Sequence, residues 1–223
     1  VLTATFVIVF FVIQLYCDFS GYCDMAIGSA RLLGFKLSEN FTRPLLAKNI
    51  KTVYQRWHIT IHKWFRDYIY FQLKPPKTKF RKGLNVLIVF GLAGLWHGSG
   101  LNFLFWGLIN GLLILILDPV IDRATKLGNK KLASITLIIA HVSVYLSLIF
   151  FRSQNLDHAK IIFSSLFNWE SSILNVNDRQ YSLTLGLGKF ELIFGLLFIV
   201  IVFSVEYYQE YHKERINSFY NGN

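Results

Sequence analysis

The chain has 223 residues, of which 53% are hydrophobic and 17% aromatic, while only 16% are charged. Soluble globular domains carry charge at about 25% of positions, so the composition argues against a soluble domain. Lys and Arg outnumber Asp and Glu by 23 to 13, which gives a formal net charge of +10. A nucleic-acid-binding protein can show such an excess. Apolar stretches of about 20 residues, long enough to cross a bilayer, argue against that class and favour a polytopic membrane protein.

The first predicted element is a transmembrane helix over about residues 1–35. The chain begins with Val1 inside an apolar stretch, without a basic region before it, and we expect it to be the C-terminal portion of a longer protein. Asp24 lies on a polar face of this helix, where packing or a pair with Arg31 or Arg56 is the simplest role. Cys17 and Cys23 are six positions apart, a spacing that excludes a disulfide within one helix.

The next predicted region, residues 37–82, is basic and aromatic. From Lys36 to Lys82 the chain holds 12 of the 23 Lys and Arg residues and only Glu39 and Asp67 as acids. Basic residues mixed with Trp and Tyr are typical of a helix at the membrane interface, or of one that re-enters the membrane; we expect such a helix over 49–71. The positive-inside rule assigns the basic loops at 74–82 and 123–131 to the cytoplasm.

Residues 84–117 are too long for one ordinary span and are interrupted at 97–100 by His-Gly-Ser-Gly. We therefore predict a helical hairpin with a histidine near its tip. The 13 residues from Leu84 to Trp96 would form about 20 Å of helix, which places His97 about two-thirds of the way across a core of about 30 Å. An ionisable side chain at that depth is a functional candidate, and the glycines beside it allow close approach of a substrate or another helix.

The C-terminal part predicts two more transmembrane helices, over 134–151 and 183–205, with an external segment and an amphipathic stretch at 157–167 between them. A polar cytoplasmic tail is expected from Glu206 onward. The predicted fold is all-α: a polytopic transmembrane helical bundle with interfacial or re-entrant helices around a central cavity. The chain would form the C-terminal part of one such membrane domain.

Three histidines lie in the central region. His58 and His62 have the i, i+4 spacing that can bind zinc, but the sequence offers no third ligand, and we expect no metal site. The simplest position for His62 is at the membrane interface. A histidine can act as a general base without a metal. The chain has neither a Gly-x-Ser-x-Gly elbow nor a phosphate-binding loop, so we expect direct transfer to a substrate hydroxyl.

Several motifs resemble those of the membrane-bound O-acyltransferases, in the branch that O-acetylates alginate. They are Tyr-Cys-Asp-Phe-Ser-Gly-Tyr-Cys-Asp-Met-Ala-Ile-Gly at 16–28, Glu-Asn-Phe at 39–41, Gln-Arg-Trp-His-Ile at 55–59, Trp-Phe-Arg-Asp-Tyr-Ile-Tyr at 64–70, Gly-Leu-Trp-His-Gly at 94–98 and Phe-Phe-Arg-Ser at 150–153. The resemblance implies a multi-helix membrane fold around a cavity. It also implies transfer of an acyl group, in this branch acetyl, to a polysaccharide hydroxyl.

The resemblance assigns roles to individual residues. His97 matches the family's catalytic histidine and His58 its second motif histidine, whereas His62 inherits no role. Residues expected to line or support the cavity are Trp57, Trp96, Arg56, Asp67 and Asp24.

The implied surroundings are the lipid bilayer of a bacterial inner membrane and a polysaccharide acceptor. A further expected partner is an extracytoplasmic acetyltransferase or an acyl carrier protein. The acyl donor would be a cytoplasmic thioester, such as acetyl-CoA or an acyl carrier, with no bound cofactor and no nucleic acid.

Three alternatives stay open at this point. The first is the related D-alanyl transfer to teichoic acid from a carrier protein. The second is a transporter that uses the histidines and Asp24 as a proton relay, although no repeated halves are seen. The third is a non-catalytic membrane scaffold that hands acyl groups to a separate transferase.

Overall fold

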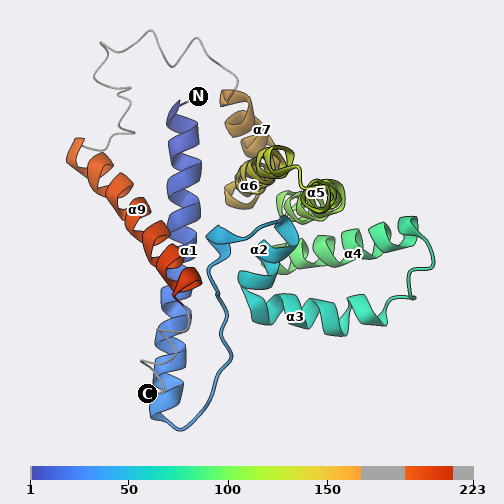
Figure 1. The fold of residues 1–223 in the computed structure, drawn as a ribbon, viewed down its shortest axis with the longest axis horizontal. Helices are drawn as coiled ribbons and strands as arrows, with labels where there is room; N and C mark the ends of the chain where they lie inside the picture. Colours follow the sequence, from blue (N-terminus) through green and yellow to red (C-terminus); the bar gives the residue numbers. More distant parts are fainter. Residues whose placement is uncertain (1, 167–188, 213–223) are drawn as a thin grey trace.

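The computed structural model describes residues 2–166 and 189–212, and every regular element in this part of the chain is a helix (Figure 1). The all-α prediction is therefore confirmed. In chain order the elements are α1 (Leu2–Leu32), η1 (Pro44–Leu46), α2 (Ile50–Arg56), α3 (Ile59–Tyr68), η2 (Tyr70–Gln72), α4 (Lys79–His97), α5 (Leu101–Lys126), α6 (Lys130–Arg152), α7 (Leu156–Ser165) and α9 (Lys189–Tyr211).

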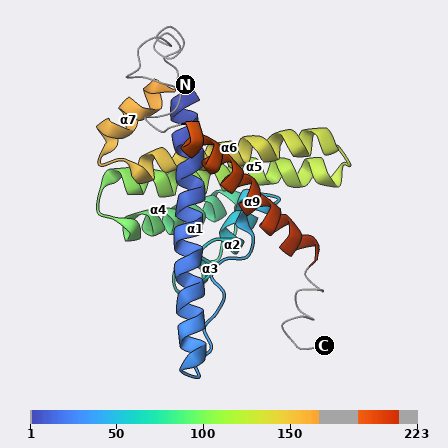
Figure 2. The same cartoon turned by 90° about the vertical axis from the view of Figure 1, so that its left-hand side faces the viewer.

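Four helices of the described part are long and apolar enough to cross a membrane: Ile8–Leu32 within α1, α5, α6, and Ile193–Tyr211 within α9. In Figure 2, α5 and α6 run side by side, and α1 runs across them. Positions 183–188 of the last predicted span lie outside the described residues. The predicted amphipathic stretch forms α7 over Leu156–Ser165, and residue 167 lies outside the described part.

The predicted hairpin is formed by α4 and α5, which the three residues 98–100 connect. The two helices are antiparallel, since Gly94 faces Phe103 near the tip and Gly83 faces Leu115 near the open end. Gly94 and Gly107 form the closest approach. A Cβ at Gly94 would collide with the carbonyl oxygen of Phe103, and a Cβ at Gly107 with the carbonyl oxygen of Phe90. Small residues that let backbones meet in this way are typical of helix contacts in membranes.

Two buried asparagines on one face of α5 hold α6. Asn102 Nδ2 donates to the carbonyl oxygens of Phe150 (3.2 Å) and Ser153 (2.9 Å) at the end of α6. Asn110 Nδ2 donates to Ser147 Oγ (2.9 Å), five residues before the end of that helix. Amide side chains that bond across an apolar interface fix the register of the two helices.

The segment expected as one helix over 49–71 consists of two helices, α2 and α3, so that expectation is wrong. Trp57 is extended, and His58 has the left-handed conformation with φ 46°. Pairing with the segment near residue 41 causes the break: the N–H of Thr42 donates to the Arg56 carbonyl, and the N–H of Ile59 to the Asn40 carbonyl, both at 2.9 Å. These bonds replace the helical ones that would have continued α2.

A carboxylate of α5 caps the N-terminus of helix α2. Asp118 is 7% exposed, and its two oxygens accept the backbone N–H groups of Ile50 and Lys51, each at 2.8 Å. Asn49 completes the start of α2 by accepting the N–H of Thr52 at 2.7 Å. The first N–H groups of a helix lack partners within it, so these contacts fix α2 against α5.

Helix α9 does not give way to a polar tail at Glu206, as the sequence suggested, but continues to Tyr211. Glu206 is only 2% exposed. One turn later Glu210 accepts from Arg43 Nε at 2.6 Å and from Arg56 Nη2 at 2.9 Å. Both carboxylates therefore face inward, and α9 fixes the segment between α1 and α3.

Candidate active site

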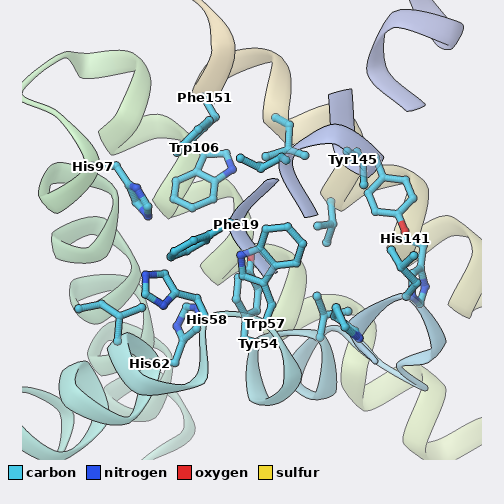
Figure 3. A pocket seen from close by; sticks show the side chains of 18 residues that line it. Phe19, Tyr54, Trp57, His58, His62, His97, Trp106, His141, Tyr145 and Phe151 are labelled. Carbon is cyan, nitrogen blue, oxygen red and sulfur yellow. The ribbon is translucent and has the colours of Figure 1, made fainter. Parts of the chain in front are cut away.

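A cavity of about 120 Å³ lies between these elements, and four histidines, His58, His62, His97 and His141, line it (Figure 3). His58 and His62 reach it from the start of α3, and His97 from the end of α4. Its remaining walls are mostly apolar and aromatic, and they come from α1, η1, α2, α5 and α6. The cavity thus joins segments that are distant in the sequence.

His97 is the last residue of α4, and three aromatic rings surround its imidazole. The ring centroids of Trp96, Trp106 and Phe151 lie 4.7, 5.2 and 5.1 Å from that of His97. The bonds of Asn102 hold the end of α6, which carries Phe151, against the hairpin tip. The hairpin therefore places His97, and α6 orients it.

His58 stands at the turn between α2 and α3. Its Nδ1 lies 3.2 Å from Asn40 Oδ1, and its ring makes edge contacts with Phe19 (4.7 Å) and Trp96 (6.0 Å). Burial, with a smaller effect from the nearby His97, lowers the pKa of His58 to about 4. At neutral pH His58 is therefore an uncharged imidazole with one free lone pair.

His62 lines the same cavity one helical turn further along α3. Its ring packs edge-on against Tyr54, with centroids 5.0 Å apart. Burial lowers the pKa of His62 to about 3 and raises that of the Tyr54 phenol. Both groups are neutral at physiological pH.

Of the five residues expected to line or support the cavity, two lie at it and three lie away from it. Trp57 lines it, and Trp96, which is 54% exposed, contacts the rings of both His58 and His97. Arg56 is paired with Glu210 outside the cavity. Asp67 forms an exposed ion pair with Arg66 (2.7 Å), and Asp24 is exposed on α1.

Sequence reasoning missed three polar side chains of the cavity wall. They are Trp106 of α5 and His141 and Tyr145 of α6. The buried indole N–H of Trp106 has no hydrogen-bond partner among the described residues. His141 Nδ1 lies 3.0 Å from the Leu137 carbonyl oxygen, which can only accept, so Nδ1 carries a proton, and the buried Nε2 has no hydrogen-bond partner among the described residues. His141 could have been found because it interrupts the apolar stretch 134–151, whereas Trp106 and Tyr145 are themselves aromatic and give no such signal.

Within the described ranges 2–166 and 189–212, no three His, Cys, Asp or Glu side chains come close enough to hold a metal ion. The site instead combines neutral imidazoles with an indole N–H donor. Such a set can accept a proton at one atom and donate a hydrogen bond at another, which is what transfer through an oxyanion requires.

Comparison with known proteins agrees with this chemistry. A model of the membrane-bound O-acyltransferase family matches residues 1–156. The chain is 36% identical over 168 residues to the probable alginate O-acetylase AlgI of Azotobacter vinelandii, covering 73% of this chain and 33% of the relative. It is 36% identical over 150 residues to the peptidoglycan O-acetyltransferase of Helicobacter pylori, covering 66% and 28%.

A third relative, the teichoic acid D-alanyltransferase of Bacillus subtilis, is 35% identical over 108 residues, or 45% of this chain and 27% of that protein. The chain thus spans about a third of the length of the curated relatives it matches. The matching family and the four apolar helices identify a multi-pass membrane protein. The matched residues include both α1 and the hairpin that carries His97, and the chain belongs to the membrane-bound O-acyltransferase family.

Proposed function

We propose that the protein transfers a short acyl group from a thioester donor to a hydroxyl of a cell-surface polysaccharide, in the inner membrane of a bacterium. The observation that carries this proposal is that His58 and His97, from segments separated by α3, η2 and the first part of the hairpin, open into one cavity. An imidazole is the side chain best suited to accept a hydroxyl proton at neutral pH.

In the proposed reaction the acceptor hydroxyl loses its proton to His97 while its oxygen attacks the carbonyl carbon of the thioester. A new C–O bond forms, and the carbonyl oxygen becomes an oxyanion. The indole N–H of Trp106, whose ring lies 5.2 Å from that of His97, would donate to this oxyanion. When the oxyanion collapses, the C–S bond breaks and the thiolate takes the proton from His97.

The size of the cavity favours a short acyl group. Its volume is about 120 Å³, and a cavity of about 150 Å³ binds benzene in another protein. An acetyl or alanyl group fits such a volume. The relatives named as O-acetylases favour acetyl, and the relative named as a D-alanyltransferase supports alanyl as the second candidate.

The donor, acceptor and partners belong to the same proposal. The donor would be acetyl-CoA or an acyl carrier, which the basic surface around residues 48–66 would attract through its phosphate. The acceptor would be a polysaccharide, reached directly or through an extracytoplasmic acetyltransferase. No cofactor other than the acyl donor is needed for this chemistry.

The decisive experiment is the His97→Ala variant of the full-length protein, with mass analysis of the cell-surface polysaccharide and a transfer assay on purified protein. We expect transfer to fall by a factor of about 10² to 10⁴, the contribution of a general base. A transporter or scaffold would give no transfer with purified wild-type protein. Undiminished acylation in a normally expressed variant would refute the role of His97.

A further inference from the structure

We propose that Asn40 is a positioning residue that holds His58 in a single tautomer, with the proton on Nδ1 and the lone pair on Nε2. The inference rests on the proposed function, because a fixed lone pair matters only if His58 serves the transfer reaction. The assignment of the tautomer itself follows from the hydrogen bonds of Asn40 and needs no substrate.

The orientation of the Asn40 amide is fixed by a group that can only donate. Asn40 Oδ1 lies 3.1 Å from the backbone nitrogen of Thr60 and 2.9 Å from its hydroxyl. A backbone N–H requires an acceptor, so the atom facing it must be the amide oxygen and not the amide nitrogen. The nitrogen then points the other way, where it donates to Cys23 Sγ of α1 at 3.3 Å.

This orientation determines the proton position on His58. Since Asn40 Oδ1 accepts, the His58 Nδ1 atom that faces it at 3.2 Å must donate and must carry the proton. His58 is uncharged at neutral pH because burial lowers its pKa to about 4. Its second nitrogen, Nε2, is therefore an acceptor, and the ring that carries it lines the cavity shared with His97.

Asn40 also fixes the backbone that carries the ring. Its carbonyl oxygen accepts the N–H of Ile59 at 2.9 Å, next to the left-handed His58, whose φ of 46° is costly for a residue with a Cβ. Asn40 itself is buried, with 8% of its surface exposed. One residue therefore sets the place, the direction and the tautomer of the imidazole.

The chemical consequence concerns the acceptor hydroxyl. An Nε2 lone pair can accept a hydrogen bond from the hydroxyl and orient it, or assist His97 in taking its proton. In the other tautomer His58 would present an N–H to the cavity and could not do so. Asn40 thus acts through His58 and touches no reacting atom.

The test compares Asn40→Asp and Asn40→Ala in the full-length protein in lipid nanodiscs. Nitrogen NMR of labelled histidine reports the tautomer of His58 without any donor or acceptor present. Asn49→Ala is the matched control, because Asn49 caps α2 as Asn40 caps α3 but bonds to no histidine of the described part. This control should lower the melting temperature while leaving the His58 tautomer unchanged.

Asn40→Ala should shift His58 towards the Nε2–H tautomer and lower transfer by about tenfold to a hundredfold, as loss of an orienting partner does elsewhere. Asn40→Asp should keep the Nδ1–H tautomer, since a carboxylate accepts both bonds. Its negative charge raises the pKa of His58, so His58 becomes protonated and loses its lone pair at a higher pH. The acid limb of the pH–rate profile should therefore lie at a higher pH than in wild type. The titratable groups around His58 are His97, His62, Tyr54 and, beyond Asn40, Cys23.

Two results would overturn the proposal: an unchanged His58 tautomer in folded Asn40→Ala protein, or an acid limb in Asn40→Asp that coincides with wild type. If Asn40→Ala does not fold, the spectrum and pH profile of Asn40→Asp decide the question. Failure of the proposed function has a different signature, because transfer would then survive in His97→Ala while the tautomer data stayed as expected.

Discussion

Two glycines of α4 should respond in opposite directions to the same substitution. Gly94→Ala adds a methyl group where α4 meets the Phe103 carbonyl of α5. Gly83→Ala adds one on the same helix where the nearest atom is Leu115 Cδ1 at 3.6 Å, an ordinary contact. The pair therefore separates the effect of close helix packing from that of glycine itself.

The expected magnitudes follow from two opposing effects. Replacing glycine by alanine within a helix favours the helix by about 1 kcal/mol, and Gly83→Ala should gain most of it. At Gly94 the new methyl meets a backbone carbonyl, which cannot change rotamer, so the overpacking cost lies near the upper end of about 1–3 kcal/mol. The net result should be a loss of about 2 kcal/mol.

Function should be affected more strongly than stability at this position. Gly94 lies three residues before His97, so moving α4 away from α5 displaces the imidazole. A displacement of about 1 Å can lower a rate by about a hundredfold. We therefore expect impaired transfer in Gly94→Ala and normal transfer in Gly83→Ala.

The assay is thermal unfolding in nanodiscs, followed by tryptophan fluorescence, together with the transfer reaction. Gly83→Ala should melt a few degrees above wild type and Gly94→Ala a few degrees below it. Stabilisation of both variants by the same amount would show that the close contact at Gly94 is absent, and the account of how His97 is placed would fail.

Two further predictions concern buried polar groups. The pKa values of His58 and His62, about 4 and 3, lie below the value of about 6.5 for an unfolded histidine. The folded protein therefore binds fewer protons between those limits, and stability should fall as the pH drops from about 6.5 towards 4. His62→Gln should make this fall shallower, as measured by melting temperatures at pH 4.5 and 7.5; an unchanged slope would contradict it. Asp118→Asn leaves one backbone N–H of α2 without its acceptor, at a cost of about 1–3 kcal/mol. Hydrogen exchange over 50–56 should rise more than elsewhere, whereas unchanged exchange would refute the capping role.

The hairpin was predictable because its cause is local. A long apolar stretch interrupted by Gly98 and Gly100 cannot continue as one helix, and α4 and α5 are separated at that point. The proximity of His58 and His62 was also visible in their spacing. These features depend on neighbours in the sequence, which a pattern reports well.

The break at His58 was not predictable because its cause is distant. The residues around it have ordinary helical character, and the turn exists because residues 40 and 42 supply alternative hydrogen-bond partners. Glu206 shows the same limitation in another form. Its charge suggested the start of a polar tail, whereas packing of α9 buries it.

His58 and His97 owe their relative position to α5, which contacts the segments that hold each of them. Near its start, α5 meets α4 at Gly107 and holds the end of α6 through Asn102, and these contacts place His97. Near its end, Asp118 holds the start of α2, which leads into the turn at His58. Asn110 ties the helix to α6 between these points. Since the contacts lie along one continuous helix, the distance between the histidines is set by a rigid element and not by direct contact between them. A cavity built in this way can admit a substrate between the two imidazoles without losing their arrangement.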